Sequence, residues 1–286
     1  MQTASPRNPT AGSAEPSWFE WQTGLLRLVE MLDEDSEVTA VAFQLHGTKG
    51  WDDVGVRFRN GTTRLFQMKH SRSGDTLTFG DLIALDEDSG PSLLRSLACA
   101  WRAERAVRGN VNCVLVTNRR AGPNWYQGRP PLAEFFAKIK ERVTQAATLV
   151  DVRWDGEDER YPGAWELFLT ELGDLDKPEQ LAFLQSLELE TSAPDLAALE
   201  VQLYERLAAL TGLPCSSVHT LFNALHAHLR KWTCHSFSSA TPTFLAMGDY
   251  PSSCRTSSIR RSQCKATLRL NSICCSSVRH PQIKRT

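Results

Sequence analysis

Two alternating runs of apolar residues flank Asn60-Gly61, and this arrangement constrains the fold more than any other feature of the sequence. The first run covers residues 51–58 and the second covers residues 64–70. Asn-Gly between two such runs is typical of a tight turn that joins antiparallel strands. The sequence therefore predicts a β-hairpin over these residues.

Polar residues lie at the outer ends of the predicted hairpin, with Asp52 and Asp53 on one strand and Gln67 and Lys69 on the other. Residues two apart in a strand share a face, so Gln67 and Lys69 point to the same side. A two-residue Asn60-Gly61 turn would pair Asp52 with Lys69, whereas a three-residue Asn60-Gly61-Thr62 loop would pair Asp53 with Lys69. The second register gives the more continuous apolar face, so we favour Asp53 and keep Asp52 as the alternative.

A carboxylate, a second oxygen ligand and an ammonium on neighbouring strands match the needs of phosphodiester cleavage. Hard divalent cations prefer oxygen ligands. A positive group stabilises the charge that develops on the phosphate. The hairpin therefore makes nucleic-acid cleavage the leading hypothesis.

Helical and strand patterns alternate along the chain, and this order indicates an α/β fold followed by a helical segment. Helices are expected at residues 18–32, 79–85, 92–107, 132–143, 195–210 and 216–232, strands at 38–45, 111–117 and 149–154, and further short elements at 161–172 and 179–184. Ser17 and Ser92 are the expected N-caps of the first helix and of the helix over 92–107.

Four regions follow from these patterns. Residues 1–16 are expected to form a disordered arm, 17–175 a nuclease core, 176–232 a helical extension, and 233–286 a tail of a different composition. The tail holds eight Lys and Arg residues against one acid, whereas residues 1–232 hold 24 against 32. The tail is either a basic disordered segment, a zinc module, or sequence read after loss of the native frame. Its abrupt change of composition favours the last.

Composition excludes several classes of protein. The net charge is −1, so no overall basic field indicates a nucleic-acid partner. No run of about 18 apolar residues predicts a membrane span, and the first residues do not match a secretory signal. The cysteines before the tail lie in apolar or helical contexts, which indicates a reduced, cytoplasmic protein. No phosphate-binding GxxxxGK[ST] loop is present.

Two groups of arginines are candidate nucleic-acid contacts. Arg102, Arg105 and Arg108 are three apart on a predicted helix and could follow a phosphate backbone, although such a set is also typical of a solvated helix face. Arg119 and Arg120 follow directly after the apolar strand 111–117, where loops commonly carry function.

The order of these pieces resembles the PD-(D/E)xK restriction-endonuclease-like fold, a mixed central sheet flanked by helices. Locally the sequence resembles the double-stranded-DNA endonuclease domain of anti-phage effectors, which occurs in CD-NTase-associated (CBASS) endonucleases and in some STAND-type defence ATPases. The similar segments fall within residues 17–232 and are residues 19–22, 52–54, 66–70, 115–119, 183–188 and 195–210.

The resemblance implies a metal-dependent deoxyribonuclease that uses Mg²⁺, or Mn²⁺ in its place. Asp53 and Gln67 would be metal ligands, with the Gln67 amide replacing the usual acid, and Lys69 would orient water or stabilise charge. Glu20 or Gln22 on the first helix could add a ligand, although Glu20 also suits a capping carboxylate.

The resemblance also implies partners. These are double-stranded DNA, further copies of the chain on activation, and a fused sensor or ATPase domain; no membrane is expected. The acidic body and the missing third acid leave an alternative, a catalytically inactive DNA-binding or oligomerisation module of the same fold.

Overall fold

The computed structural model describes residues 10–33, 35–43, 50–51, 53–71, 75–83, 91–123, 129–236 and 245–246. The chain divides into two units. The first unit comprises residues 1–20, 48–51 and 66–195, and the second comprises residues 21–47, 52–65 and 196–286.

The strands form a six-stranded sheet in the order β7-β5-β3-β2-β1-β8, and a second sheet pairs β4 with β6. Strands β5 and β7 pair in parallel, whereas β1 pairs antiparallel with β2 and with β8. The predicted α/β class with a mixed sheet is therefore confirmed, and its restriction-endonuclease-like topology stays a prediction. The strands are β1 Val38–Phe43, β2 Val54–Phe58, β3 Thr63–Lys69, β4 Thr76–Leu77, β5 Val111–Thr117, β6 Arg120–Ala121, β7 Leu187–Glu190 and β8 Leu245–Ala246.

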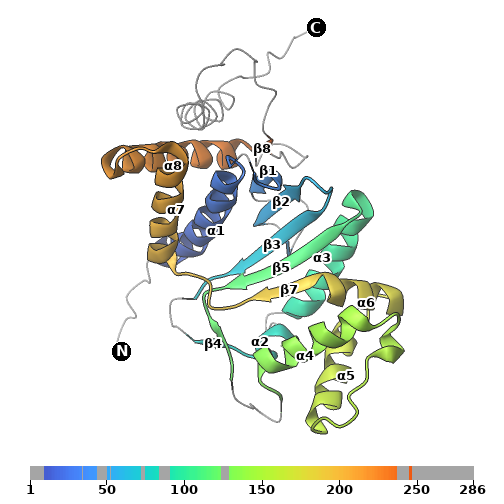
Figure 1. Ribbon diagram of the computed structural model, residues 1–286. Coiled ribbons are helices and arrows are strands. Elements are labelled where there is room, and N and C mark those ends of the chain that lie inside the picture. Colours follow the sequence, from blue (N-terminus) through green and yellow to red (C-terminus); the bar gives the residue numbers. More distant parts are fainter. Residues whose placement is uncertain are drawn as a thin grey trace, which may run out of the picture. The chain divides into compact units, whose positions relative to one another are not determined.

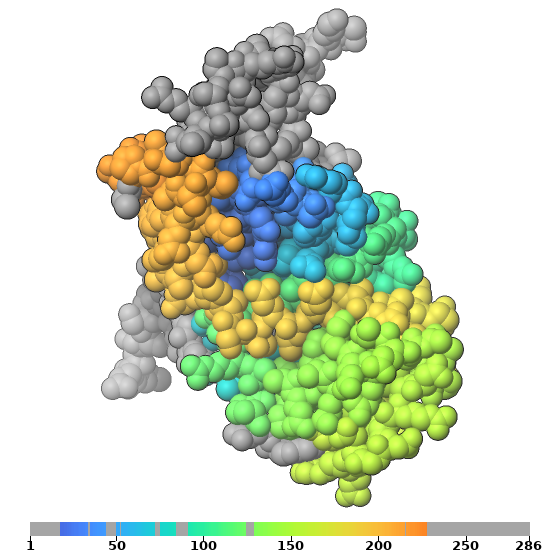
Figure 2. Space-filling model, in the orientation of Figure 1, coloured from blue at the N-terminus to red at the C-terminus, as the bar shows by residue number. Residues whose placement is uncertain are grey.

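Helices flank these strands, and Figure 1 shows α4, α5 and α6 close together in the first unit. In Figure 2 the green surface of α4 and α5 lies next to the yellow surface that includes β7. Among the described residues, no helix is both long and apolar enough to cross a membrane. The helices are α1 Thr10–Glu30, α2 Phe79–Ile83, α3 Leu93–Arg108, α4 Leu132–Gln145, the 3₁₀ turn η1 Leu149–Asp151, α5 Arg160–Glu171, α6 Lys177–Ser186, α7 Leu196–Thr211 and α8 Cys215–Ser236.

Three expectations about element bounds need correction. Helix α1 begins at Thr10, so Ser17 lies inside it and the expected disordered arm overlaps its first turns. Residues 149–154 contain no strand, because a capping box between Thr148 and Asp151 closes the turn η1. The expected helical extension from residue 176 also contains the strand β7, which pairs with β5, and the expected domain bounds stay a prediction.

An aromatic cluster fills the core of the first unit between α2, α4 and α5. Phe135 is fully buried and stacks on Trp154 and Tyr161, with ring centroids 5.7 and 6.3 Å away. The rings of Phe79 and Phe168 meet it edge-on at 5.2 and 5.7 Å. Aromatic pairs in these geometries contribute beyond the burial of their area, so Phe135 is the centre of this core.

Two cations hold Glu157 beside this cluster. Lys138 Nζ lies 2.9 Å from Glu157 Oε2, and Arg142 Nη2 lies 2.6 Å from Glu157 Oε1. The hydrogen bond from Lys138 and then that from Arg142 hold the pKa of Glu157 below its usual range. Folding therefore favours the ionised carboxylate.

We expect Glu157 to make the stability of the protein depend on acid pH. Because the folded-state pKa is lowered, the contribution is present above the unfolded-state pKa and is lost as pH falls through the folded-state pKa. Melting temperatures of wild type and Glu157→Gln should differ most near neutral pH and converge below about pH 4. If the two melting temperatures differ by the same amount near neutral pH and below about pH 4, this role of Glu157 is wrong.

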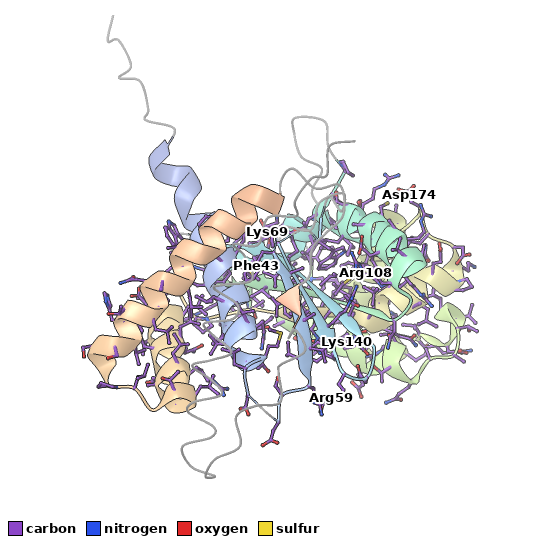
Figure 3. The ribbon with its side chains drawn as sticks, turned by 90° about the horizontal axis from the view of Figure 1, so that it is seen from above. Phe43, Arg59, Lys69, Arg108, Lys140 and Asp174 are labelled. Atoms are coloured by element: carbon purple, nitrogen blue, oxygen red, sulfur yellow. The ribbon has the colours of Figure 1, made fainter. Side chains whose placement is uncertain are left out.

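In the second unit, helix α1 approaches strand β1 at a glycine. A Cβ atom at Gly24 would lie 2.2 Å from the Cε1 atom of Phe43, a ring that is 2% exposed and is labelled in Figure 3. Residues 199, 203 and 207 of α7 are buried leucines, and α7 packs against α8. Leucines four apart form one helix face, which explains this pairing.

The hairpin has a different turn from either one expected. The Gly61 amide donates to the Phe58 carbonyl at 3.0 Å, and the Phe58 amide donates to the Thr62 carbonyl at 2.9 Å. Gly61 has φ +83° and Asn60 Oδ1 accepts from the Thr62 amide at 2.9 Å. The loop is therefore Arg59-Asn60-Gly61, closed by Phe58 and Thr62, because glycine adopts the left-handed conformation that this loop needs.

The described part of the expected tail pairs with the second unit. Leu245 and Ala246 form β8, opposite Val41 and Ala40 of β1. Helix α8 also extends past the expected end of its helix at residue 232, to Ser236. Residues 237–244 and 247–286 lie outside the described residues, so the proposed loss of reading frame stays a prediction.

Candidate functional site

Strands β3 and β5 end side by side in the first unit. Thr117 Oγ1 donates a hydrogen bond to the Lys69 carbonyl at 2.5 Å. Asn118 Nδ2 donates to the Ser71 carbonyl at 2.7 Å, and the Ser71 amide donates to Asn118 Oδ1 at 2.9 Å. Further along, β4 pairs in parallel with β6. From one contact to the next, the residue numbers rise in both segments, from Lys69 and Thr117 to Ser71 and Asn118. Strands β3 and β5 therefore run in the same direction.

Strand β7 ends at the same place. The amides of Ala193 and Ser192 donate to the carbonyls of Thr117 and Arg119, at 3.0 and 2.9 Å. Ser192 has φ +59°, an uncommon conformation for a residue other than glycine. Ligands of open α/β sheets bind outside the carboxyl ends of the strands. The joined ends of β3, β5 and β7 are therefore the candidate site of the first unit.

Three of the predicted site residues belong to elements that meet here. Lys69 is exposed at the last position of β3, and Gln67 is 6% exposed two residues earlier. The ring of Phe19 on α1 lies 5.1 Å from that of His70, and Glu20, half-buried, is the next residue. His70 therefore packs against α1.

Asp53 belongs to the second unit and directly precedes β2. It is 9% exposed, unusual burial for a carboxylate. Asp52, the alternative, lies outside the described residues. The turn closed by Phe58 and Thr62 is neither of the turns from which the two pairings with Lys69 were derived, so the register no longer favours Asp53 over Asp52. The structural observation on Asp53 as a candidate ligand is therefore its burial.

The chemistry of these donors suits a hard cation. Among the described residues, no three His, Cys, Asp or Glu side chains gather into a metal-binding group. Mg²⁺ needs fewer protein ligands than that, because it is usually held by one or two carboxylates and fills its shell with water and substrate phosphate. Gln67 and Glu20 carry such oxygens in the first unit, and Asp53 carries one in the second. Gln67 supplies a neutral one, which lowers the expected metal affinity.

Gln22 has an unsatisfied oxygen in the second unit. Its side chain is 6% exposed, and its Oε1 atom accepts no hydrogen bond. Buried amide oxygens are normally bonded. Gln22 lies half a helical turn from Gly24, the residue that approaches β1. Helical geometry therefore turns the Gln22 side chain away from β1, and Gln22 is not carried further as a ligand.

The two arginines after β5 have different environments. Arg119 Nη2 donates to the Thr76 carbonyl at 2.5 Å and lies 3.3 Å from Asp81 Oδ2, so this guanidinium braces β4 against β6. Arg120 is exposed on β6, opposite Thr76. Arg120 is therefore better placed than Arg119 for the predicted phosphate contact.

Arg102 and Arg105 lie elsewhere in the first unit, on the last turns of α3. That end of α3 adjoins the amino end of β5, because Trp101 Nε1 donates to the Val111 carbonyl at 3.3 Å. Arg102 Nη1 donates to the Asp174 carbonyl at 2.7 Å. The structure thus brings neither arginine to the carboxyl end of β5, where Lys69 lies. Figure 3 labels Lys69 together with Arg108, which pairs with Glu104 on its own helix.

Thr117 and Asn118 are the residues whose importance sequence reasoning underestimated. Thr117 was interpreted only as the end of a strand, yet it is fully buried and holds the backbone of Lys69. Asn118 holds the backbone of Ser71 from both sides. Polar residues at the end of a buried apolar strand were the available signal. We call this pair the β5 clamp.

We expect Asn118→Ala to loosen the segment that carries Lys69. Loss of both bonds should raise the deuterium-exchange rate of the Ser71 amide about tenfold or more, since one hydrogen bond contributes roughly 1 kcal/mol. Exchange at β7 should change little. Asn112→Ala, at the other end of β5, is the matched control. Unchanged exchange at Ser71 would show that the clamp does not hold it.

Comparison with known proteins finds no matching family model and no matching curated protein. Solved structures of the Acinetobacter baumannii Cap4 SAVED/CARF-domain containing receptor do match. With the cyclic trinucleotide 2'3'3'-cAAA the identity is 11% and the TM-score 0.42, over 91% of this chain and 46% of that one. For the structure with 3'3'3'-cAAA, the identity is 12% and the TM-score is 0.41, over 78% of this chain and 41% of that chain. The structure named without a ligand gives 11% and 0.42, over 91% and 48%.

The chain thus spans less than half the length of these structures. A likeness of this degree establishes neither family nor activity. Two of the structures are described with a cyclic trinucleotide, and none with double-stranded DNA. The prediction of double-stranded DNA as partner is therefore corrected and is not carried further.

Proposed function

We propose that this chain is a metal-dependent phosphodiester hydrolase that serves in anti-phage defence. The observation that carries the chemistry is Lys69, exposed at the joined carboxyl ends of β3 and β5 with its carbonyl held by Thr117. The defence role rests on the sequence resemblance to anti-phage effectors described above. The substrate is left at the level of its chemical class, a phosphodiester.

Lys69 would act on the charge of the reacting phosphate. No carboxylate among the described residues pairs with its ammonium. The neighbouring Gln67 is neutral, so it does not compete with phosphate for Lys69. The bond from Thr117 fixes the backbone from which the ammonium reaches the phosphate, and a cation at that position stabilises developing negative charge. Lys69 therefore fits the role of charge stabiliser or of the group that orients the attacking water.

The sequence resemblance implies Asp53 and Gln67 as the ligands of a divalent cation, with Glu20 as a further candidate. When bound, Mg²⁺ supplies a polarised phosphate oxygen and a more acidic water. Asp53 is a carboxylate that is 9% exposed in the second unit. Glu20 adds a half-buried carboxylate from α1, next to the contact between Phe19 and His70.

The experiment measures hydrolysis of bis(p-nitrophenyl) phosphate, a linear single-stranded oligonucleotide and a cyclic trinucleotide, with Mg²⁺, Mn²⁺ or EDTA. We expect turnover of at least one substrate with either metal and none with EDTA. Asp53→Asn should raise the Mg²⁺ concentration needed for half-maximal rate, because it removes a negative ligand. Asp155→Asn, exposed in the first unit, is the matched control.

A folded protein that hydrolyses none of these substrates in either metal would overturn the enzyme assignment. It would favour a non-catalytic module of the same fold. Among the described residues, no three His, Cys, Asp or Glu side chains form a metal-binding group, which agrees with that alternative. Hydrolysis that persists in EDTA and in Asp53→Asn would instead reject the metal site alone.

A further inference from the structure

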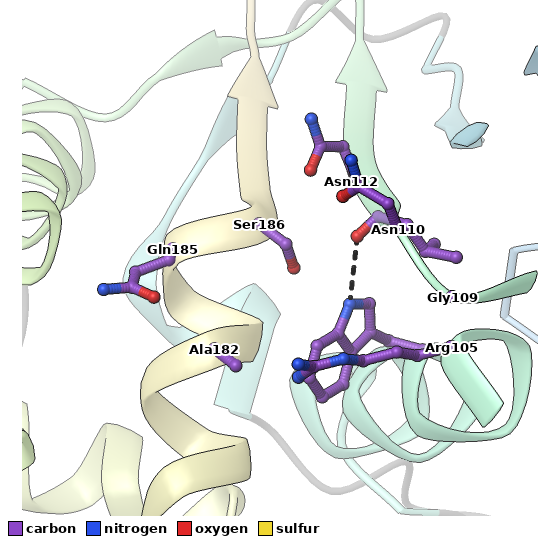
Figure 4. A pocket seen from close by; sticks show the side chains of 9 residues that line it. Arg105, Gly109, Asn110, Asn112, Ala182, Gln185 and Ser186 are labelled. Atoms are coloured by element: carbon purple, nitrogen blue, oxygen red, sulfur yellow. Dashed lines mark hydrogen bonds between the residues drawn. The ribbon is translucent and has the colours of Figure 1, made fainter. Parts of the chain in front are cut away.

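A hollow of about 540 Å³ opens at the amino end of β5, in the first unit. Its walls come from the last turns of α3, the start of β5 and the end of α6 (Figure 4). It is lined by Trp101, Arg105, Gly109, Asn110, Val111, Asn112, Ala182, Gln185 and Ser186. Pockets for small molecules have volumes of roughly 300–1,000 Å³. The hollow is therefore large enough for one small ligand.

Arg105 gives the hollow its charge. Its guanidinium carbon lies 5.0 Å from the ring centroid of Trp101, so the cation lies over the indole. Trp101 is 1% exposed, and its Nε1 bond to the Val111 carbonyl fixes the ring. Among the described residues, no carboxylate pairs with Arg105. One face of the guanidinium thus rests on a fixed ring, while the rest of the exposed side chain stays available.

Amide and hydroxyl groups surround this cation. Asn112 on β5 and Ser186 at the end of α6 extend toward the hollow in Figure 4, and Asn110 lies beside them. Gln185 is directed differently, since its Nε2 atom donates to the Val143 carbonyl at 2.9 Å. The Ser186 hydroxyl donates to the Phe183 carbonyl at 2.8 Å, so only its oxygen is left to accept from a ligand. The Arg105 guanidinium and the Asn112 amide are therefore the main polar groups that the hollow offers.

We propose that this hollow binds a mononucleotide. A guanidinium stacked on an indole offers its outer face to a planar base and its N–H edge to a phosphate. Asparagine amides carry a donor and an acceptor together, the pattern that base edges also present. Arg105 would bind the base face and phosphate, and Asn112 would read the base edge. Lys69 lies at the other end of β5, about 20 Å away at the usual rise per residue.

Calorimetric titration of the whole chain with AMP, GMP, CMP and UMP tests the proposal, with adenosine and inorganic phosphate as partial ligands. We expect at least one nucleotide to bind more tightly than either partial ligand by about tenfold or more, because both base and phosphate contribute. A mononucleotide contains no phosphodiester, so binding is measured independently of the proposed hydrolase activity.

Two variants sharpen the result. Arg105→Gln should weaken binding about tenfold or more, since it removes a charge-assisted contact. Asn112→Ala should weaken it less and change the order of preference among the four bases. Arg102→Gln is the matched control, because Arg102 lies one turn earlier on α3 and does not line the hollow. All three melting temperatures are checked against wild type.

Three outcomes would overturn the proposal. These are no heat with any nucleotide at millimolar concentration, equal binding of inorganic phosphate, which would indicate an adventitious ion only, and unchanged binding by Arg105→Gln. Lys69→Met should leave nucleotide binding intact. The experiment therefore distinguishes an absence of nucleotide binding in the hollow from an absence of the proposed hydrolase activity.

Discussion

Replacing Lys69 by Met should lower the rate of phosphodiester hydrolysis about 100- to 1,000-fold, the usual loss when one preorganised group that stabilises the transition state is removed. Methionine keeps most of the volume and unbranched shape of lysine while removing its charge. Lys69 is exposed, so the change should leave the melting temperature within about 2 °C of wild type. The measurement is kcat and KM for each substrate cleaved by the wild type.

The control is Lys177→Met, at the exposed first position of α6. It removes the same charge from the first unit and should leave kcat unchanged. Lys69→Arg should restore part of the activity, because it returns the positive charge with a different geometry. A folded Lys69→Met protein that cleaves at the wild-type rate would reject the mechanism, whatever the outcome for the metal ligands.

The secondary structure near the candidate site was largely predictable, because local patterns decide it. Strand β5 is almost continuously apolar and is buried along most of its length, as expected for a parallel strand. Helix α3 begins after Ser92, whose side chain accepts from the Arg95 amide at 3.2 Å. Both signals lie within a few residues of the element they define.

The arrangement of the site was less predictable, because it depends on distant residues. The Asn-Gly pair signals a hairpin, but only the left-handed Gly61 shows which loop is formed. Arg119 was interpreted as a phosphate contact, and its partner Asp81 lies 38 residues earlier in the chain. Strand β7 is four residues long, too short for a clear period, and its pairing with β5 is not local.

Phe135→Ala should give the largest loss of stability, about 3–5 kcal/mol, as is usual when a fully buried Phe is truncated to Ala. The side chain is 0% exposed and lies between two stacked rings and two edge-on rings. Its removal leaves a cavity that flat rings fill poorly. Urea unfolding of both proteins, followed by tryptophan fluorescence because Trp154 stacks on Phe135, measures the change.

Val150→Ala is the control for this prediction. Val150 is 70% exposed on the turn η1, close in sequence to Trp154, and its truncation should change the unfolding free energy by no more than about 0.5 kcal/mol. A loss below about 1 kcal/mol for Phe135→Ala would mean that neighbouring rings collapse into the space, and the cluster would not be the centre of the core. A large loss with kcat retained at low temperature would separate the aromatic core, which holds the first unit together, from Lys69, which is proposed to act on the phosphate.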